Sequence, residues 1–221
     1  MADRAGHQSR RLTSPPVLLA LLLAWAGAAG AASLTAAVRT SAGAPVKDAA
    51  IILEPTGRTP PPVRARATIE QRDREFIPYL SIVRKGTSIE FPNHDPVKHH
   101  IYSFSPAKVF EIKLYAGKSV NPVVFDKTGE VVLGCNIHDW MAAHVLVVDT
   151  PWFAKTGADG LARIDGVPAG TYRLRLWHPR QKVATPDRDL SLGAAVRRIE
   201  FTVDLTPRLI VPKPPLDAGG Y

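Results

Sequence analysis

The feature that most constrains the fold is a series of short apolar and β-branched runs, each followed by Gly, Pro, Asn or Asp. No helical period is sustained after residue 31, so these runs predict strands separated by turns. The expected strands are 34–39, 49–53, 67–71, 79–83, 87–91, 100–104, 109–114, 119–125, 130–134, 144–148, 161–164, 171–177 and 198–204. With 45% hydrophobic and 22% charged residues the chain can bury a core, so we expect an all-β protein built from sandwiches.

Proline-rich stretches divide the strand pattern into blocks. Thr59-Pro60-Pro61-Pro62 has the composition of a stiff linker, Pro151 follows the strand expected at 144–148, and residues 206–221 form a proline-rich tail. A middle block, residues 64–149, is thereby separated from an earlier segment, 33–58, and a later one, 150–205.

The N-terminal segment, residues 1–31, has the composition of a secretory signal. Arg4, Arg10 and Arg11 precede the apolar run 17–24, and small residues follow with several A-x-A-like cleavage sites. A retained membrane anchor is the alternative, but the run is shorter than the roughly 20 residues that a spanning helix needs. We therefore expect export to the periplasm or a similar compartment by a route left open, with no membrane attachment after cleavage.

The charge is moderately basic. It falls from +8 to +6 when the signal is removed, because three arginines and one aspartate leave with it. In an exported protein, a basic charge indicates a protein partner with an acidic docking surface more than it indicates nucleic acid as a partner. The charge could equally serve solubility alone.

A single cysteine, Cys135, excludes an internal disulfide in a compartment that is oxidising. An exposed lone thiol would be open to oxidation there, which favours a sulfur that is buried or bound to a metal.

Cys135, His138 and Met141 follow the expected strand 130–134 with the spacing Cys-x2-His-x2-Met. Each residue taken alone has a structural explanation, as a buried thiol, a loop histidine or a packed methionine. Together, a thiolate, an imidazole and a thioether in seven residues form a donor set that favours copper over harder cations.

A second imidazole is available in the pair His99-His100, which lies at the start of the strand expected at 100–104. A trigonal His2Cys set with a weak axial methionine is the geometry of electron-transfer copper sites. Neighbouring strand residues point to opposite faces, so only one of the two histidines can face Cys135. His94, His144 and His178 lack comparable support and are interpreted as structural or surface residues.

These motifs resemble the cupredoxin family, most closely its amicyanin-like members with a short Cys-x2-His-x2-Met loop. In that family the upstream histidine stands eight residues beyond an aromatic, which from Phe91 gives His99, with Asn93 between them. The resemblance spans residues 64–149 and implies a Greek-key β-sandwich with one type 1 copper held by His99, Cys135, His138 and Met141. His100 departs from the family pattern, which has Asn there, and stays the alternative ligand.

The same resemblance implies a route for electrons. It makes His138 the exposed edge of the site, with Trp140, Met141 and Pro106 near the docking patch.

The flanking segments resemble a carboxypeptidase regulatory-like, or transthyretin-like, sandwich in their turns, such as Gly43-Ala44-Pro45-Val46 and Val167-Pro168-Ala169-Gly170. Each segment alone has too few strands to bury a face. We expect 33–58 and 150–205 to pair into one small sandwich with the copper domain inserted between them. A single continuous sandwich with extra edge strands is the alternative.

The function expected from these residues is that of an exported electron carrier serving a dehydrogenase, oxidase or cytochrome by transient docking. Copper storage, delivery or sensing without electron transfer is the alternative, although the Met or His repeats of storage proteins are absent; a scaffold that has lost its metal is a third. An enzyme is the least supported class, because no general base and orienting carboxylate pair with Cys135 and no C-x-x-C-H haem motif occurs.

Overall fold

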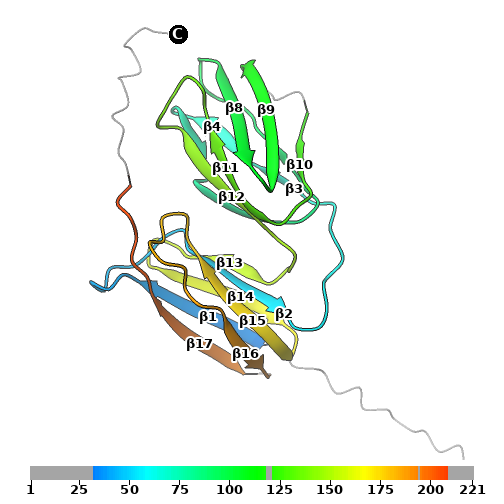
Figure 1. The fold of residues 1–221 in the computed structure, drawn as a ribbon, viewed down its shortest axis with the longest axis vertical. Coiled ribbons are helices and arrows are strands. Elements are labelled where there is room, and N and C mark those ends of the chain that lie inside the picture. Colours follow the sequence, from blue (N-terminus) through cyan, green and yellow to red (C-terminus); the bar gives the residue numbers. More distant parts are fainter. Residues whose placement is uncertain (1–31, 118–120, 194, 209–221) are drawn as a thin grey trace, which may run out of the picture.

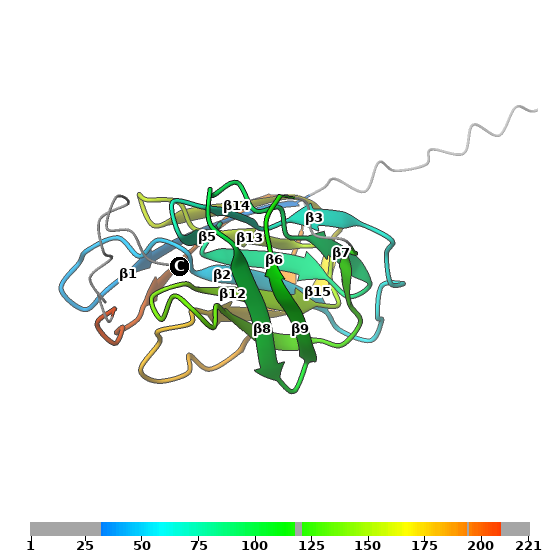
Figure 2. The same ribbon diagram turned by 90° about the horizontal axis from the view of Figure 1, so that it is seen from above.

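The computed structural model describes residues 32–117, 121–193 and 195–208, and within them every regular element is a strand. The expected signal, 1–31, and the tail from residue 209 lie outside the described residues. In the described part of the chain no helix is long and apolar enough to cross a membrane. The strands form two sandwiches that are stacked in Figure 1 and overlie one another when seen from above in Figure 2.

The upper body in Figure 1, here called the middle sandwich, is built from the chain between residues 66 and 148. Its five-stranded sheet has the order β6-β12-β11-β8-β9, its three-stranded sheet the order β10-β7-β3, and β4 pairs with β5 as a hairpin. The bounds are β3 Arg66–Thr68, β4 Glu70–Arg72, β5 Glu75–Ile77, β6 Leu80–Arg84, β7 Thr87–Glu90, β8 His99–Ser105, β9 Lys108–Tyr115, β10 Val123–Phe125, β11 Gly129–Gly134 and β12 Ala142–Val148. The inward residues of these strands and of the segments between them, among them Phe91, Ile101 and Leu133, form one buried core.

The lower body, here called the flanking sandwich, combines strands from both ends of the chain. Its sheets have the orders β14-β1-β17 and β13-β2-β15-β16. The bounds are β1 Ala32–Arg39, β2 Ala50–Pro55, β13 Phe153–Lys155, β14 Leu161–Val167, β15 Gly170–Trp177, β16 Arg188–Leu192 and β17 Val196–Thr202. Since β1 pairs with β14 and β17, and β2 with β13 and β15, the chain leaves this sandwich after β2 and returns to it at β13.

The two sandwiches share an apolar seam. On β2, Ile51 and Leu53 face the core of the flanking sandwich, whereas Ile52 faces the seam. On β12, Leu146 faces the seam while Val147 faces the core of the middle sandwich. Both strands are buried on both faces, which explains why their sequences are continuous apolar runs and do not alternate.

The prediction of an all-β protein is confirmed, and the differences from the expected strands have local causes. The strand expected at 67–71 is divided into β3 and β4, and three further short strands, β5, β13 and β16, were not expected. The turn between β4 and β5 uses Asp73 and Arg74 at φ 54° and 55°, so it lacks the glycine that marks such turns in a sequence. β13 has three residues, and β16 buries only Leu190 and Leu192, so neither gives a clear period.

Candidate metal centre

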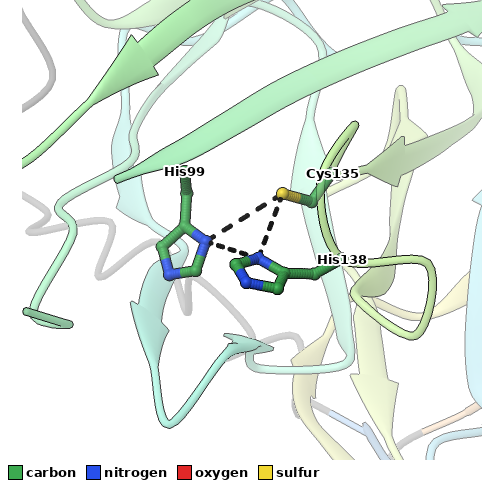
Figure 3. A group of neighbouring side chains, drawn as sticks. All are labelled: His99, Cys135 and His138. Atoms are coloured by element: carbon green, nitrogen blue, oxygen red, sulfur yellow. Dashed lines mark hydrogen bonds between the residues drawn. The ribbon is translucent and has the colours of Figure 1, made fainter. Parts of the chain in front are cut away.

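The site forms where β8 and β11 lie side by side at one end of the middle sandwich. Gly134, the last residue of β11, pairs with Tyr102 of β8, and β8 begins at His99. Cys135 follows β11 directly, and the loop that it opens returns to the sheet at Ala142, where β12 starts. A distant strand and one tight loop thus supply side chains to the same point, as Figure 3 shows.

Three donor atoms converge there. His99 Nδ1 lies 3.1 Å from His138 Nδ1 and 3.9 Å from Cys135 Sγ, and the sulfur lies 3.6 Å from His138 Nδ1. All three residues are buried. Among the His, Cys and carboxylate side chains of the described residues, these three form the cluster that could hold a metal ion. The point equidistant from the three atoms lies about 2.1 Å from each, which is the length of a bond from imidazole nitrogen to a metal.

His99 and His100 lie on opposite faces of β8. His99 has no exposed surface and faces the sulfur, whereas His100 Nε2 lies 2.9 Å from Glu111 Oε1 on the neighbouring strand. The side chain of His100 is also in edge contact with Tyr102 on the outer face of the sheet. The structure therefore brings His99, and not His100, to Cys135 and His138.

Met141 closes the loop. Its backbone N–H donates to the His138 carbonyl at 2.9 Å, and the residue is 2% exposed within the core cluster of the middle sandwich, to which Cys135 also belongs. A soft thioether is therefore buried in the same loop turn as the thiol and imidazole.

Asp95 contacts His99 on the side of the ring that faces away from Cys135, and this contact was not predicted from the sequence. Its Oδ2 lies 2.7 Å from His99 Nε2, the ring nitrogen that faces away from the sulfur. The carboxylate also accepts the backbone N–H groups of Asp73 at 2.6 Å and Arg74 at 2.9 Å. The available signal was the turn Asn93-His94-Asp95-Pro96, where Asn93 Oδ1 accepts the Asp95 N–H at 2.9 Å.

The electrostatics of the cluster favour a thiolate. Burial would raise the pKa of Cys135, but hydrogen bonding to His99 and to the backbone N–H groups of Ile137 and His100 outweighs it and lowers the pKa. Burial would lower the pKa of His99, but Cys135 and Asp95 stabilise its protonated ring and raise it. Burial, and the nearby positive charges of His99 and Arg74, lower the pKa of His138. Metal binding needs a thiolate and neutral imidazoles, so the lowered pKa values of Cys135 and His138 favour it, whereas the raised pKa of His99 opposes it.

The expected electron exit differs from the structure at one residue, Pro106. His138 keeps 6% of its surface exposed, and Trp140 packs beside it with ring centroids 5.1 Å apart, so only a small part of the imidazole can be reached. Pro106 follows the far end of β8, about 20 Å along the strand from His99, and is not near the site.

The remaining histidines lie outside the cluster. His94 is exposed beside Glu70, His144 lies 3.1 Å from Glu130 Oε1, and His178 is buried in the flanking sandwich, where its Nδ1 accepts the Arg180 N–H at 3.0 Å. Each has a polar partner in the structure.

Comparison with known proteins finds similarity only among solved structures. No protein-family model matches the chain, and no curated protein matches it. The copper-containing nitrite reductase of Thermus scotoductus SA-01 is 21% identical with a TM-score of 0.36, over 43% of this chain and 24% of that one. A reduced amicyanin variant is 12% identical with a TM-score of 0.35, over 46% of this chain and 99% of that one. A purple cupredoxin from Nitrosopumilus maritimus is 23% identical with a TM-score of 0.33, over 38% of this chain and 99% of that one. The chain therefore spans about a quarter of the nitrite reductase.

Proposed function

We propose that the middle sandwich is a cupredoxin domain and that the protein is a type 1 copper protein that carries single electrons. The observation that carries the proposal is the buried triangle of His99 Nδ1, His138 Nδ1 and Cys135 Sγ, with separations of 3.1 to 3.9 Å. Two imidazoles and a thiolate with a buried methionine in the same loop are the donor set of electron-transfer copper. His99, Cys135 and His138 would hold the metal and Met141 would supply the weak axial thioether.

The residues around the triangle hold it in one geometry. Asp95 fixes the orientation of His99 through Nε2, and the Met141 N–H to His138 carbonyl bond closes the loop. A carboxylate behind a ligating histidine sets its tautomer and raises its basicity. Copper held there would alternate between Cu(I) and Cu(II), and the protein's part is to keep the ligand positions alike in both states.

An exported electron carrier also needs partners outside the cytoplasm. The secretory composition of residues 1–31 supports export to the periplasm, and a single thiol engaged with metal is compatible with an oxidising compartment. We propose transient docking to an exported dehydrogenase, oxidase or cytochrome, without a catalytic reaction of its own.

The test is to add Cu(II) to the purified mature chain and record the visible spectrum. An intense blue thiolate-to-copper absorption is expected, and it should be absent in Cys135→Ser and His99→Ala but retained in His100→Ala. A colourless parent chain would exclude a type 1 site. If the colour survives His99→Ala and disappears in His100→Ala, the second histidine ligand is His100 and not His99.

Storage, delivery or sensing is the competing function of the same site. Reversible one-electron reduction of the blue form, without loss of copper, supports the carrier. Rapid transfer of Cu(I) from the reduced protein to a Cu(I) chelator would support delivery instead.

A further inference from the structure

The imidazole of the Cys loop is almost fully buried, and an indole with more exposed surface packs beside it. His138 is 6% exposed, whereas Trp140 is half-buried and lies beside it with ring centroids 5.1 Å apart and planes at 50°. On this side of the site the π-surface that a partner can reach therefore belongs to Trp140.

We propose that Trp140 provides the electronic coupling between the metal centre and a redox partner, an inference that rests on the proposed function. With copper held by His99, Cys135 and His138, one electron would pass between the metal and a one-electron acceptor or donor in contact with Trp140, so that one centre would be oxidised and the other reduced. No bond forms or breaks. The indole stays neutral and keeps its Nε1 proton, which is already hydrogen-bonded.

Trp140 is held in a fixed position by the turn between β4 and β5. Its Nε1–H donates to the Arg74 carbonyl at 3.0 Å, and the Arg74 guanidinium lies 5.9 Å from the centre of its ring. A cation over an indole face is attracted to its π-electrons. The indole therefore has a polar and an electrostatic contact that keep it against His138.

The same turn is tied to the other imidazole. Asp73 and Arg74 both adopt the left-handed backbone conformation that non-glycine residues rarely take. Their two N–H groups donate to Asp95, whose carboxylate also contacts His99 Nε2. One turn thus holds both the ring that packs against His138 and the carboxylate that orients His99.

An alternative exit exists on the outer face of the five-stranded sheet. The ring of Tyr102 packs against Gly134, where an added Cβ would lie 2.8 Å from Tyr102 Cζ, and Phe104 is 5.2 Å from Tyr102 and 79% exposed. Through Tyr102 this pair of rings contacts the backbone at Gly134, next to Cys135. Neither ring contacts the imidazole of His99 or of His138. Trp140 contacts a ligand ring directly, which is why the relay is assigned to it.

The experiment measures the rate at which hexacyanoferrate(III) oxidises the reduced, copper-loaded full chain in a stopped-flow instrument. Trp140→Leu should lower the second-order rate constant roughly tenfold, equivalent to about 1.4 kcal/mol of activation free energy, with the reduction potential and blue band unchanged. Trp140→Phe, which keeps a ring but loses the Nε1–H, should fall between the parent and Trp140→Leu. Phe104→Leu is the matched control and should leave the rate unchanged, because its side chain is exposed on the alternative path.

Each outcome decides the assignment. An unchanged rate in Trp140→Leu overturns the relay while leaving the type 1 site intact, and a larger loss in Phe104→Leu moves the exit to the outer face of the sheet. If Trp140→Leu fails to bind copper, Trp140→Phe supplies the comparison. A second readout is tryptophan emission: Cu(II) should quench more of it in the parent than in Trp140→Phe, and equal quenching contradicts close coupling between Trp140 and the metal. If the copper-loaded parent chain shows no blue colour, both the proposed type 1 copper function and the role of Trp140 are wrong.

Discussion

Asp95 Oδ2 lies 2.7 Å from His99 Nε2, on the side of the ring opposite Cys135, and this contact leads to the first prediction. Asp95→Asn replaces one carboxylate oxygen by an amide NH2 group, which donates but cannot accept, so at least one of the contacts to His99, Asp73 and Arg74 is lost. Loss of such a support behind a metal ligand typically costs 10–100-fold in metal affinity. We expect the affinity for copper, measured by competition with a chelator, to fall within about that range.

Asp139→Asn is the matched control for this change. Asp139 lies in the Cys loop and its side chain is exposed, so the same loss of charge occurs close to the site without touching His99. Equal losses of affinity in the two variants would mean that charge alone, and not the orientation of His99, is responsible.

A second prediction concerns the seam between the sandwiches. Leu146 on β12 is 7% exposed and packs with Ile52 of β2, so Leu146→Ala should lower the free energy of unfolding by about 2–5 kcal/mol. Leu114→Ala, in β9 of the same sheet, removes the same atoms from a side chain that is 52% exposed and should cost about 0.5 kcal/mol. Chemical denaturation followed by circular dichroism measures both, and similar losses would show that the seam contributes little.

Much of this architecture was predictable because period and spacing are local properties of a chain. The strands of β7, β11 and β15 follow from alternating or continuous apolar residues, and Cys135, His138 and Met141 follow from their separation in one loop. The choice of His99 needed both the family pattern and the alternation of side chains along a strand. In the structure its Nδ1 lies 3.9 Å from the sulfur.

The remainder depends on contacts that no local pattern records. Trp140 packs against His138, and its indole donates to a carbonyl in a hairpin 66 residues earlier. That hairpin turn has no glycine, so its sequence, Asp73-Arg74, carries no turn signal of the usual kind. The seam between the two sandwiches could not be predicted either. A strand that is buried on both faces has the same continuous apolar run whichever sheet packs on it.

A third prediction compares two glycines with similar backbone conformations. Gly160 has φ 75°, and a Cβ added there would lie 2.5 Å from the Val38 carbonyl oxygen, whereas Gly57 has φ 80° and nothing within 4 Å. Alanine at either position bears the left-handed backbone penalty of about 1–2 kcal/mol. Gly160→Ala should lose clearly more stability than Gly57→Ala, because the Gly160 N–H and the strand at Val38 must also move. Equal losses in urea unfolding would show that the clash at Val38 is relieved without cost.

The last prediction is a pH dependence that originates in the flanking sandwich. His178 is 3% exposed, and burial, together with the charge of Arg180, lowers its pKa to about 4. In the unfolded chain the pKa of histidine is about 6.5, so the unfolded state takes up a proton first as the pH falls. The contribution of the neutral ring is therefore complete above pH 6.5 and is lost between pH 6.5 and about 4.

His178→Asn isolates this effect, because the Asn amide oxygen can accept the Arg180 N–H in place of Nδ1 but does not titrate. Between pH 7 and pH 5 the parent should lose about 2 kcal/mol more of its free energy of unfolding than the variant, with both proteins in the same metal state. Because the other titrating groups are common to both proteins, their contributions cancel in the difference. Parallel stability profiles for parent and variant would mean that His178 is protonated equally in the folded and unfolded chains, and that its burial does not keep the ring neutral.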